Sequence, residues 1–191
     1  MNLHDPSVKV TSPDQALQYL KEGNKRFVDN ATMPRDTNKA DLAATAGQQS
    51  PFAVVLTCSD SRVSPEIYFD QKIGDIFVIR NAGNYADQEA LGSLEFAVAA
   101  LGAQIVVVVG HTMCGAVFNS FDKTGGLPAN LTAVLDNIRV NIESCPSKEA
   151  AVGVHATAMA DVVKANEVIK AKNTPVYSAV YDIATGVVAF Q

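Results

Sequence analysis

Apolar residues gather in short runs that alternate with segments of helical spacing. Three runs are apolar and β-branched almost throughout, at residues 52–57, 75–79 and 105–109. This pattern is typical of strands buried on both faces of a parallel sheet, so we expect these runs to form the centre of one sheet. Two further runs, at residues 176–182 and 186–190, flank a short turn and predict a strand pair at the end of the chain.

Apolar residues three and four positions apart predict the helices. Ser12, Pro13 and Gln15 form a cap, a first-turn proline and a capping-box partner ahead of the first of them. Gly102 stands where a crossover helix between the second and third strands would stop. The first predicted helix begins at about residue 13. The other predicted helices cover about 39–46, 90–101, 131–142 and 152–169.

This order of elements predicts a single α/β domain over residues 1–191. We expect a central, mostly parallel β-sheet with an antiparallel C-terminal edge strand, flanked by helices. Residues 1–50 would form an N-terminal helical arm and residues 51–191 the α/β core. In such folds the active groups lie just beyond the carboxyl ends of the central strands.

Composition narrows the possible partners. The 191 residues are 48% hydrophobic and 18% charged, as in an ordinary globular domain, and the net charge is −5 without a basic cluster. Nucleic acid is therefore not an expected partner. The longest apolar run is far shorter than the roughly 20 residues of a membrane span, and residues 1–10 lack the pattern of a signal peptide. We therefore expect no membrane partner. The chain has three cysteines, and this odd number favours free thiols and a cytoplasmic location.

Two cysteines and a histidine follow the predicted central strands. Cys58 directly follows the first strand, while His111 and Cys114 follow the third. If these strands are neighbours, two sulfurs and one ring nitrogen converge at the same edge of the sheet. These are three ligands of a tetrahedral zinc site, and three protein ligands with a free fourth position are the count of a catalytic site.

Asp60 and Arg62 follow the first cysteine by two and four residues. A charge-assisted pair between them is geometrically easy, and an ordinary surface ion pair would contribute little. Their position beside a metal-binding thiolate favours a role at the site. The carboxylate could accept a hydrogen bond from a group on the metal or bind the metal itself, and Arg62 would hold it in the first state.

The remaining cysteine and histidines are interpreted as structural. Cys145 has no cysteine or histidine nearby in the sequence, and a lone buried cysteine usually behaves as a small apolar residue. His155 lies on an apolar helical face and is expected to be a hydrogen-bonded residue of the core or an interface. His4 lies close to the N-terminus and is not expected to bind the metal.

Five further features of the sequence are the segments CSDSRV at 58–63, RNAGN at 80–84, SLEFAV at 93–98, GHTMCGA at 110–116 and YDIATGVV at 181–188. In these segments the chain resembles β-class carbonic anhydrases. The resemblance implies one zinc ion per chain held by Cys58, His111 and Cys114, with Asp60 and Arg62 as a catalytic dyad.

The resemblance also implies a substrate pocket and an activity. The pocket would contain Gln49, Phe77 and Phe96 and would be assembled at the interface of a homodimer or tetramer. The activity would be the reversible hydration of carbon dioxide to bicarbonate and a proton by hydroxide on the zinc ion. Val55 stands where the allosteric bacterial branch has tryptophan, which favours the plant-like branch with an open site.

Two alternatives to this activity stay open. The chain could be a catalytically silent zinc protein of the same fold that serves as a regulator. It could also be a hydrolase that attacks a related linear molecule, such as carbon disulfide, at the same metal. The intact Asp60–Arg62 dyad disfavours the silent protein.

Overall fold

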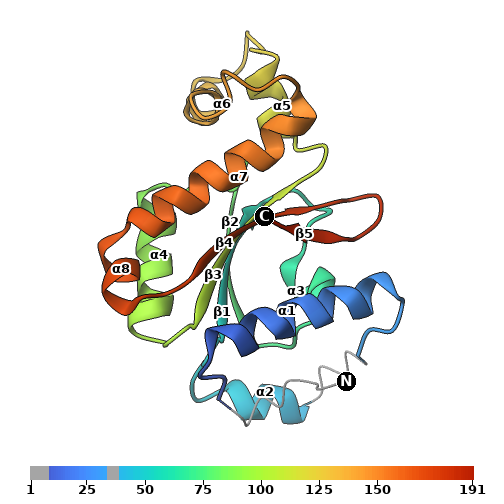
Figure 1. The fold of residues 1–191 in the computed structure, drawn as a ribbon, viewed down its shortest axis with the longest axis vertical. Helices are drawn as coiled ribbons and strands as arrows, with labels where there is room; N and C mark the ends of the chain where they lie inside the picture. The colour runs from blue at the N-terminus through green and yellow to red at the C-terminus, as the bar shows by residue number, and fades with distance from the viewer. Residues whose placement is uncertain (1–8, 34–38) are drawn as a thin grey trace.

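Five strands form one sheet in the order β2–β1–β3–β4–β5 in the computed structural model, which describes residues 9–33 and 39–191 (Figure 1). Neighbours are parallel except β4 and β5, which are antiparallel. The predicted α/β fold with an antiparallel C-terminal edge strand is thereby confirmed. His4, which is interpreted as not binding metal, lies outside the described residues. The strands are β1 (Ala53–Cys58), β2 (Ile76–Asn81), β3 (Ile105–His111), β4 (Val176–Tyr181) and β5 (Val188–Phe190).

Helices cover both faces of this sheet (Figure 1). One face carries α4, α7 and α8, the other carries α1 and α3, and α5 and α6 lie beyond the carboxyl ends of the strands. In the described ranges no helix is long and apolar enough to cross a membrane. The helices are α1 (Pro13–Val28), α2 (Lys39–Thr45), α3 (Pro65–Tyr68), α4 (Gln88–Ala99), α5 (Gly115–Phe121), α6 (Ala129–Arg139), α7 (Lys148–Ala165) and α8 (Glu167–Lys172).

The two central strands supply both cores of the protein. Every residue of β1 and β3 is buried, and successive side chains point to opposite faces of the sheet. Val54 packs in one core with Leu94 of α4, whereas Val55 packs in the other with Leu20 of α1. This packing on both faces fixes the carboxyl ends of β1 and β3 side by side.

The expectation that residues 75–79 lie at the centre of the sheet is wrong. Among residues 9–33 and 39–191, β2 pairs only with β1 and is therefore an edge strand, and Phe77 and Ile79 are half-buried. An apolar run indicates that a strand is covered, but it does not tell which element covers it. In the part of the chain that the structure describes, one side of β2 carries no neighbouring strand.

The helix predicted over residues 152–169 is divided in two by Asn166. The backbone of Asn166 is extended, with φ −63° and ψ 137°. The Asn166 side chain accepts hydrogen bonds from the N–H groups of Val168 and Ile169 at the start of α8. Asparagine is a favoured N-cap, which explains the break. The capping box expected at Ser12 is also wrong in detail, because its side chain makes no capping hydrogen bond although α1 begins at Pro13.

Candidate metal centre

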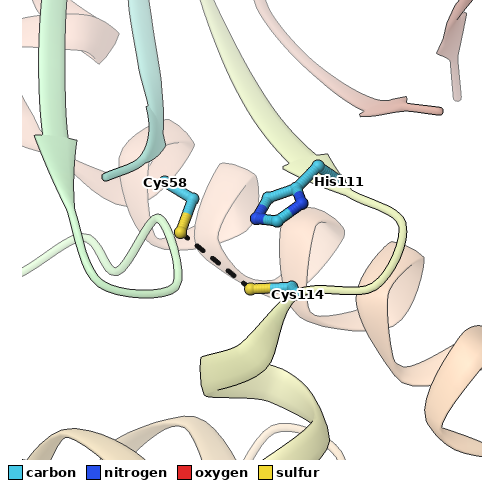
Figure 2. A group of neighbouring side chains, drawn as sticks. All are labelled: Cys58, His111 and Cys114. Atoms are coloured by element: carbon cyan, nitrogen blue, oxygen red, sulfur yellow. Dashed lines mark hydrogen bonds between the residues drawn. The ribbon is translucent and has the colours of Figure 1, made fainter. Parts of the chain in front are cut away.

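Cys58, His111 and Cys114 converge at the carboxyl edge of the sheet, as Figure 2 shows. Thr57 pairs with Val109, so Cys58 at the end of β1 lies beside the end of β3, where His111 stands. Their ligand atoms all lie within 4.8 Å of one another, and all three side chains are buried. The convergence predicted from the sequence is confirmed.

The spacing of these atoms fits a tetrahedral metal ion. The two sulfurs are 4.0 Å apart. With zinc–sulfur bonds of about 2.3 Å, tetrahedral geometry places two sulfurs about 3.8 Å apart, whereas a disulfide would hold them at about 2.0 Å. The two sulfurs therefore already lie close to the separation that a tetrahedral zinc ion requires.

The imidazole of His111 is oriented as a metal ligand. Its Nδ1 lies 2.9 Å from the carbonyl oxygen of Thr112, and only a protonated nitrogen can donate to a carbonyl. The Nε2 atom therefore carries a lone pair, and it is buried without a hydrogen-bond partner among the described residues. A metal ion would satisfy this nitrogen, and the bond at Nδ1 is the usual support of a metal-binding histidine.

The two thiols perturb each other. The Cys114 thiol donates a hydrogen bond to Cys58 Sγ, which lowers the pKa of Cys58 although burial opposes the shift. The same hydrogen bond raises the pKa of Cys114. A metal ion that bound both sulfurs would displace the proton of this hydrogen bond. Cys114 is the N-cap of α5.

Asp60 and Arg62 form the predicted pair beside the cluster. The Arg62 side chain donates from Nε to Oδ1 at 2.9 Å and from Nη2 to Oδ2 at 2.7 Å, and its backbone N–H donates to Oδ1 at 2.9 Å. These hydrogen bonds hold the pKa of Asp60 well below its usual range. Asp60 Oδ2 lies 4.0 Å from His111 Nε2, so the carboxylate adjoins the space between the three ligands.

Arg80, to which no role was assigned from the sequence, holds the loop that carries these groups. Its Nε donates to the carbonyl oxygen of Cys58 at 3.1 Å, and its Nη2 donates to that of Asp60 at 2.8 Å. Arg80 pairs in register with Thr57, which places its guanidinium beside the end of β1. The sequence signal at this position is that Arg80 opens the RNAGN segment at 80–84, but that segment does not reveal a contact with the carbonyl oxygens of another loop.

The residues interpreted as structural lie outside the ligand set. His155 is fully buried in α7, and its Nε2 donates to the carbonyl oxygen of Gly83 at 2.8 Å, as expected for a hydrogen-bonded core histidine. Cys145 has an unpaired thiol of intermediate burial and is not part of the cluster.

The structure does not bring Gln49, Phe77 and Phe96 to the cluster within one chain. Gln49 is exposed and precedes β1, whereas Cys58 is at the opposite end of that strand. Phe77 pairs with Val54, four residues before Cys58, which corresponds to about 13 Å along the strand. Phe96 lies near Phe77, with ring centroids 6.4 Å apart, and is 50% exposed.

Comparisons with known proteins agree with this site. A sequence model of the carbonic anhydrase family matches residues 53–188, which include all three ligands. Carbonic anhydrase 2 of Mycobacterium tuberculosis is 47% identical over 107 residues, covering 56% of this chain and 52% of the relative. The carbonic anhydrase of Candida albicans is 29% identical over 193 residues, covering 92% of this chain and 68% of the relative. This chain thus spans about half the length of the mycobacterial relative that it matches.

Solved structures share the fold. The β-carbonic anhydrase of Coccomyxa, in complex with acetazolamide, matches with a TM-score of 0.69 at 27% identity, covering 90% of this chain and 84% of that one. CafA of Aspergillus fumigatus matches with a TM-score of 0.71 at 25% identity, covering 93% and 89%. Because the family model spans well over half of the chain and the β-class structures superpose on nearly all of it, this chain belongs to the β class of the carbonic anhydrase family.

Proposed function

We propose that this chain catalyses the reversible hydration of carbon dioxide to bicarbonate and a proton. The observation that carries the proposal is the buried cluster of Cys58, His111 and Cys114 with the Asp60 carboxylate beside it. A zinc ion bound there would supply a nucleophile at moderate pH by lowering the pKa of water. The side chains around the cluster would orient this nucleophile and bind the substrate.

Asp60 is proposed as the group that orients the nucleophile. The hydrogen bonds from Arg62 keep it ionised, so at neutral pH it can only accept a hydrogen bond. Its Oδ2 adjoins the ligand atoms and could accept a hydrogen bond from a hydroxyl located beside them. Such an acceptor turns a lone pair of that hydroxyl toward the substrate, and Arg62 keeps the carboxylate from binding the metal instead.

A second copy of the chain is proposed to complete the substrate pocket. Gln49, Phe77 and Phe96 are too far from their own cluster, and Phe77 and Phe96 lie where β2 leaves one edge of the sheet unpaired. In a homodimer or tetramer these residues would face the cluster of the partner. The two aromatic rings would offer an apolar surface to carbon dioxide, and the Gln49 amide would donate to the charge that develops on its oxygen.

Replacing Phe96 with glutamate tests this assembly. The side chain is 50% exposed, so the chain should still fold, but a charge would oppose burial of this surface against another copy. We expect the mass measured by light scattering to fall to that of a smaller assembly and the hydration rate to fall at least about tenfold. Val140→Glu is the matched control, because Val140 is 70% exposed on another part of the surface. Unchanged mass and rate for Phe96→Glu would contradict the composite pocket.

Two finer assignments belong to the same proposal. Val55, which is buried in the core, stands where the allosteric bacterial branch has tryptophan. This supports membership of the plant-like branch of the family, which has an open site. A cytoplasmic location is proposed because the thiols of Cys58 and Cys114 bind metal only when they stay reduced.

Stopped-flow measurement of carbon dioxide hydration with an indicator dye tests the proposed function. We expect turnover well above the uncatalysed rate, its loss when a chelator removes zinc, and its return when zinc is added back. Zinc binding without hydration would identify a silent protein of the same fold. Release of hydrogen sulfide from carbon disulfide without carbon dioxide hydration would identify the hydrolase instead.

A further inference from the structure

Gly83 connects the metal cluster to α7. This residue lies in the segment between β2 and α4, and its N–H group donates a hydrogen bond to Cys58 Sγ at 3.4 Å. Its carbonyl oxygen accepts the hydrogen bond from His155 Nε2 at 2.8 Å. One residue is therefore held between a metal-binding sulfur and a buried imidazole that the proposed reaction does not use.

The surroundings of Gly83 leave it little freedom to move. Its φ of +76° is a left-handed conformation, and a Cβ atom would lie 2.5 Å from Ile138 Cδ1. The side chain of Asn81 fixes the same segment by donating to the carbonyl oxygen of Tyr85 at 2.7 Å and accepting from its N–H at 2.8 Å. The hydrogen bond from His155 is the contact that holds the carbonyl of Gly83 itself.

His155 donates a specific hydrogen bond to Gly83 in addition to packing in the core. It is fully buried, and the Tyr85 ring stacks parallel to its imidazole with 15° between the planes. Since a carbonyl only accepts, Nε2 must carry the proton. The Nδ1 atom has no hydrogen-bond partner among the described residues, so the ring is held in the core by one polar contact, the one to Gly83.

We propose that His155 is a positioning residue of the metal centre, which holds Gly83 so that its N–H group stays directed at Cys58 Sγ. This inference rests on the metal site of the proposed function. A hydrogen bond to a metal-binding thiolate orients its lone pairs and withdraws electron density from the sulfur. Partners of this kind outside the ligand set typically change metal affinity by about 10- to 100-fold when removed.

Zinc affinity of the full chain, measured by competition with a chromophoric chelator, is the first readout. We expect His155→Leu to weaken zinc binding by about 10- to 100-fold. In His155→Gln the amide nitrogen can take the place of Nε2 and donate to the same carbonyl, so the affinity should return most of the way to wild type. Val163→Ala is the matched control: this residue of α7 is equally buried, and its loss should reduce stability without changing zinc affinity.

The cobalt-substituted proteins provide a readout that a purely structural role would not change. Loss of the N–H···S hydrogen bond raises the energy of the sulfur electrons, so the sulfur-to-cobalt charge-transfer band should move to longer wavelength in His155→Leu. The band should return toward wild type in His155→Gln and stay unchanged in Val163→Ala. Unchanged affinity and an unchanged band in His155→Leu would overturn the proposal.

A measurement on the wild-type protein covers the case in which His155→Leu does not fold. Nitrogen-15 NMR of the histidine side chains distinguishes the two neutral tautomers, and we expect His155 to carry its proton on Nε2. A proton on Nδ1 would overturn the proposal, because Nε2 could not then donate to Gly83. Wild-type protein that binds no zinc would instead contradict the proposed function, so the two failures are distinguishable.

Discussion

Replacing Cys58 with serine is expected to remove both zinc and carbon dioxide hydration. A serine hydroxyl is a poor zinc ligand because it stays protonated near neutral pH, whereas the hydrogen bond from Cys114 lowers the pKa of the Cys58 thiol. Removal of a hydrogen-bond partner of a metal ligand typically weakens metal binding by about 10- to 100-fold. Removal of a ligand itself should therefore weaken zinc binding by more than about a hundredfold. Elemental analysis of the purified protein and the stopped-flow assay measure the two effects.

Cys145→Ser is the matched control for this experiment. Cys145 has an unpaired thiol outside the cluster, so its replacement should leave zinc content and turnover at wild-type values. The pair of variants separates loss of the metal site from a general effect of removing a thiol. A Cys58→Ser protein that keeps one zinc ion per chain and normal turnover would place the metal elsewhere and contradict the proposed function.

The ligand cluster could be predicted because its side chains follow the two most regular strands. Strands β1 and β3 are apolar throughout and buried on both faces, which marks them as central and parallel. Once they are neighbours, Cys58 and His111 must lie close together. The position of β2 could not be predicted in this way, because an apolar strand at an edge has the same pattern as an apolar strand between two others.

The groups that support the cluster could not be predicted because they act through the backbone. Arg80 donates to carbonyl oxygens of Cys58 and Asp60, and His155 donates to that of Gly83. Every residue has a carbonyl group, so no spacing of side chains reveals such a contact before the loops are placed. The apolar neighbours of His155 correctly predicted its burial, but they did not indicate its connection to the metal centre.

Replacing Arg62 with alanine is expected to close the site with Asp60. The substitution removes the hydrogen bonds from Nε and Nη2 and leaves only the backbone N–H at position 62 bonded to the carboxylate. The pKa of Asp60 should rise toward its usual value of about 4, so the carboxylate stays ionised at neutral pH. Since its Oδ2 lies only 4.0 Å from His111 Nε2, a small rotation brings it within reach of a metal held by the cluster.

The expected result is a fall in turnover of about a hundredfold or more, because a carboxylate ligand would fill the position that the reaction needs and the orienting acceptor would be lost. X-ray absorption of the zinc-loaded variant should show a carboxylate oxygen as the fourth ligand. Adding Asp60→Ala to this variant removes that ligand, so the absorption spectrum should lose the carboxylate while turnover stays low. An Arg62→Ala protein with wild-type turnover and an unchanged spectrum would show that Arg62 does not control the position of Asp60.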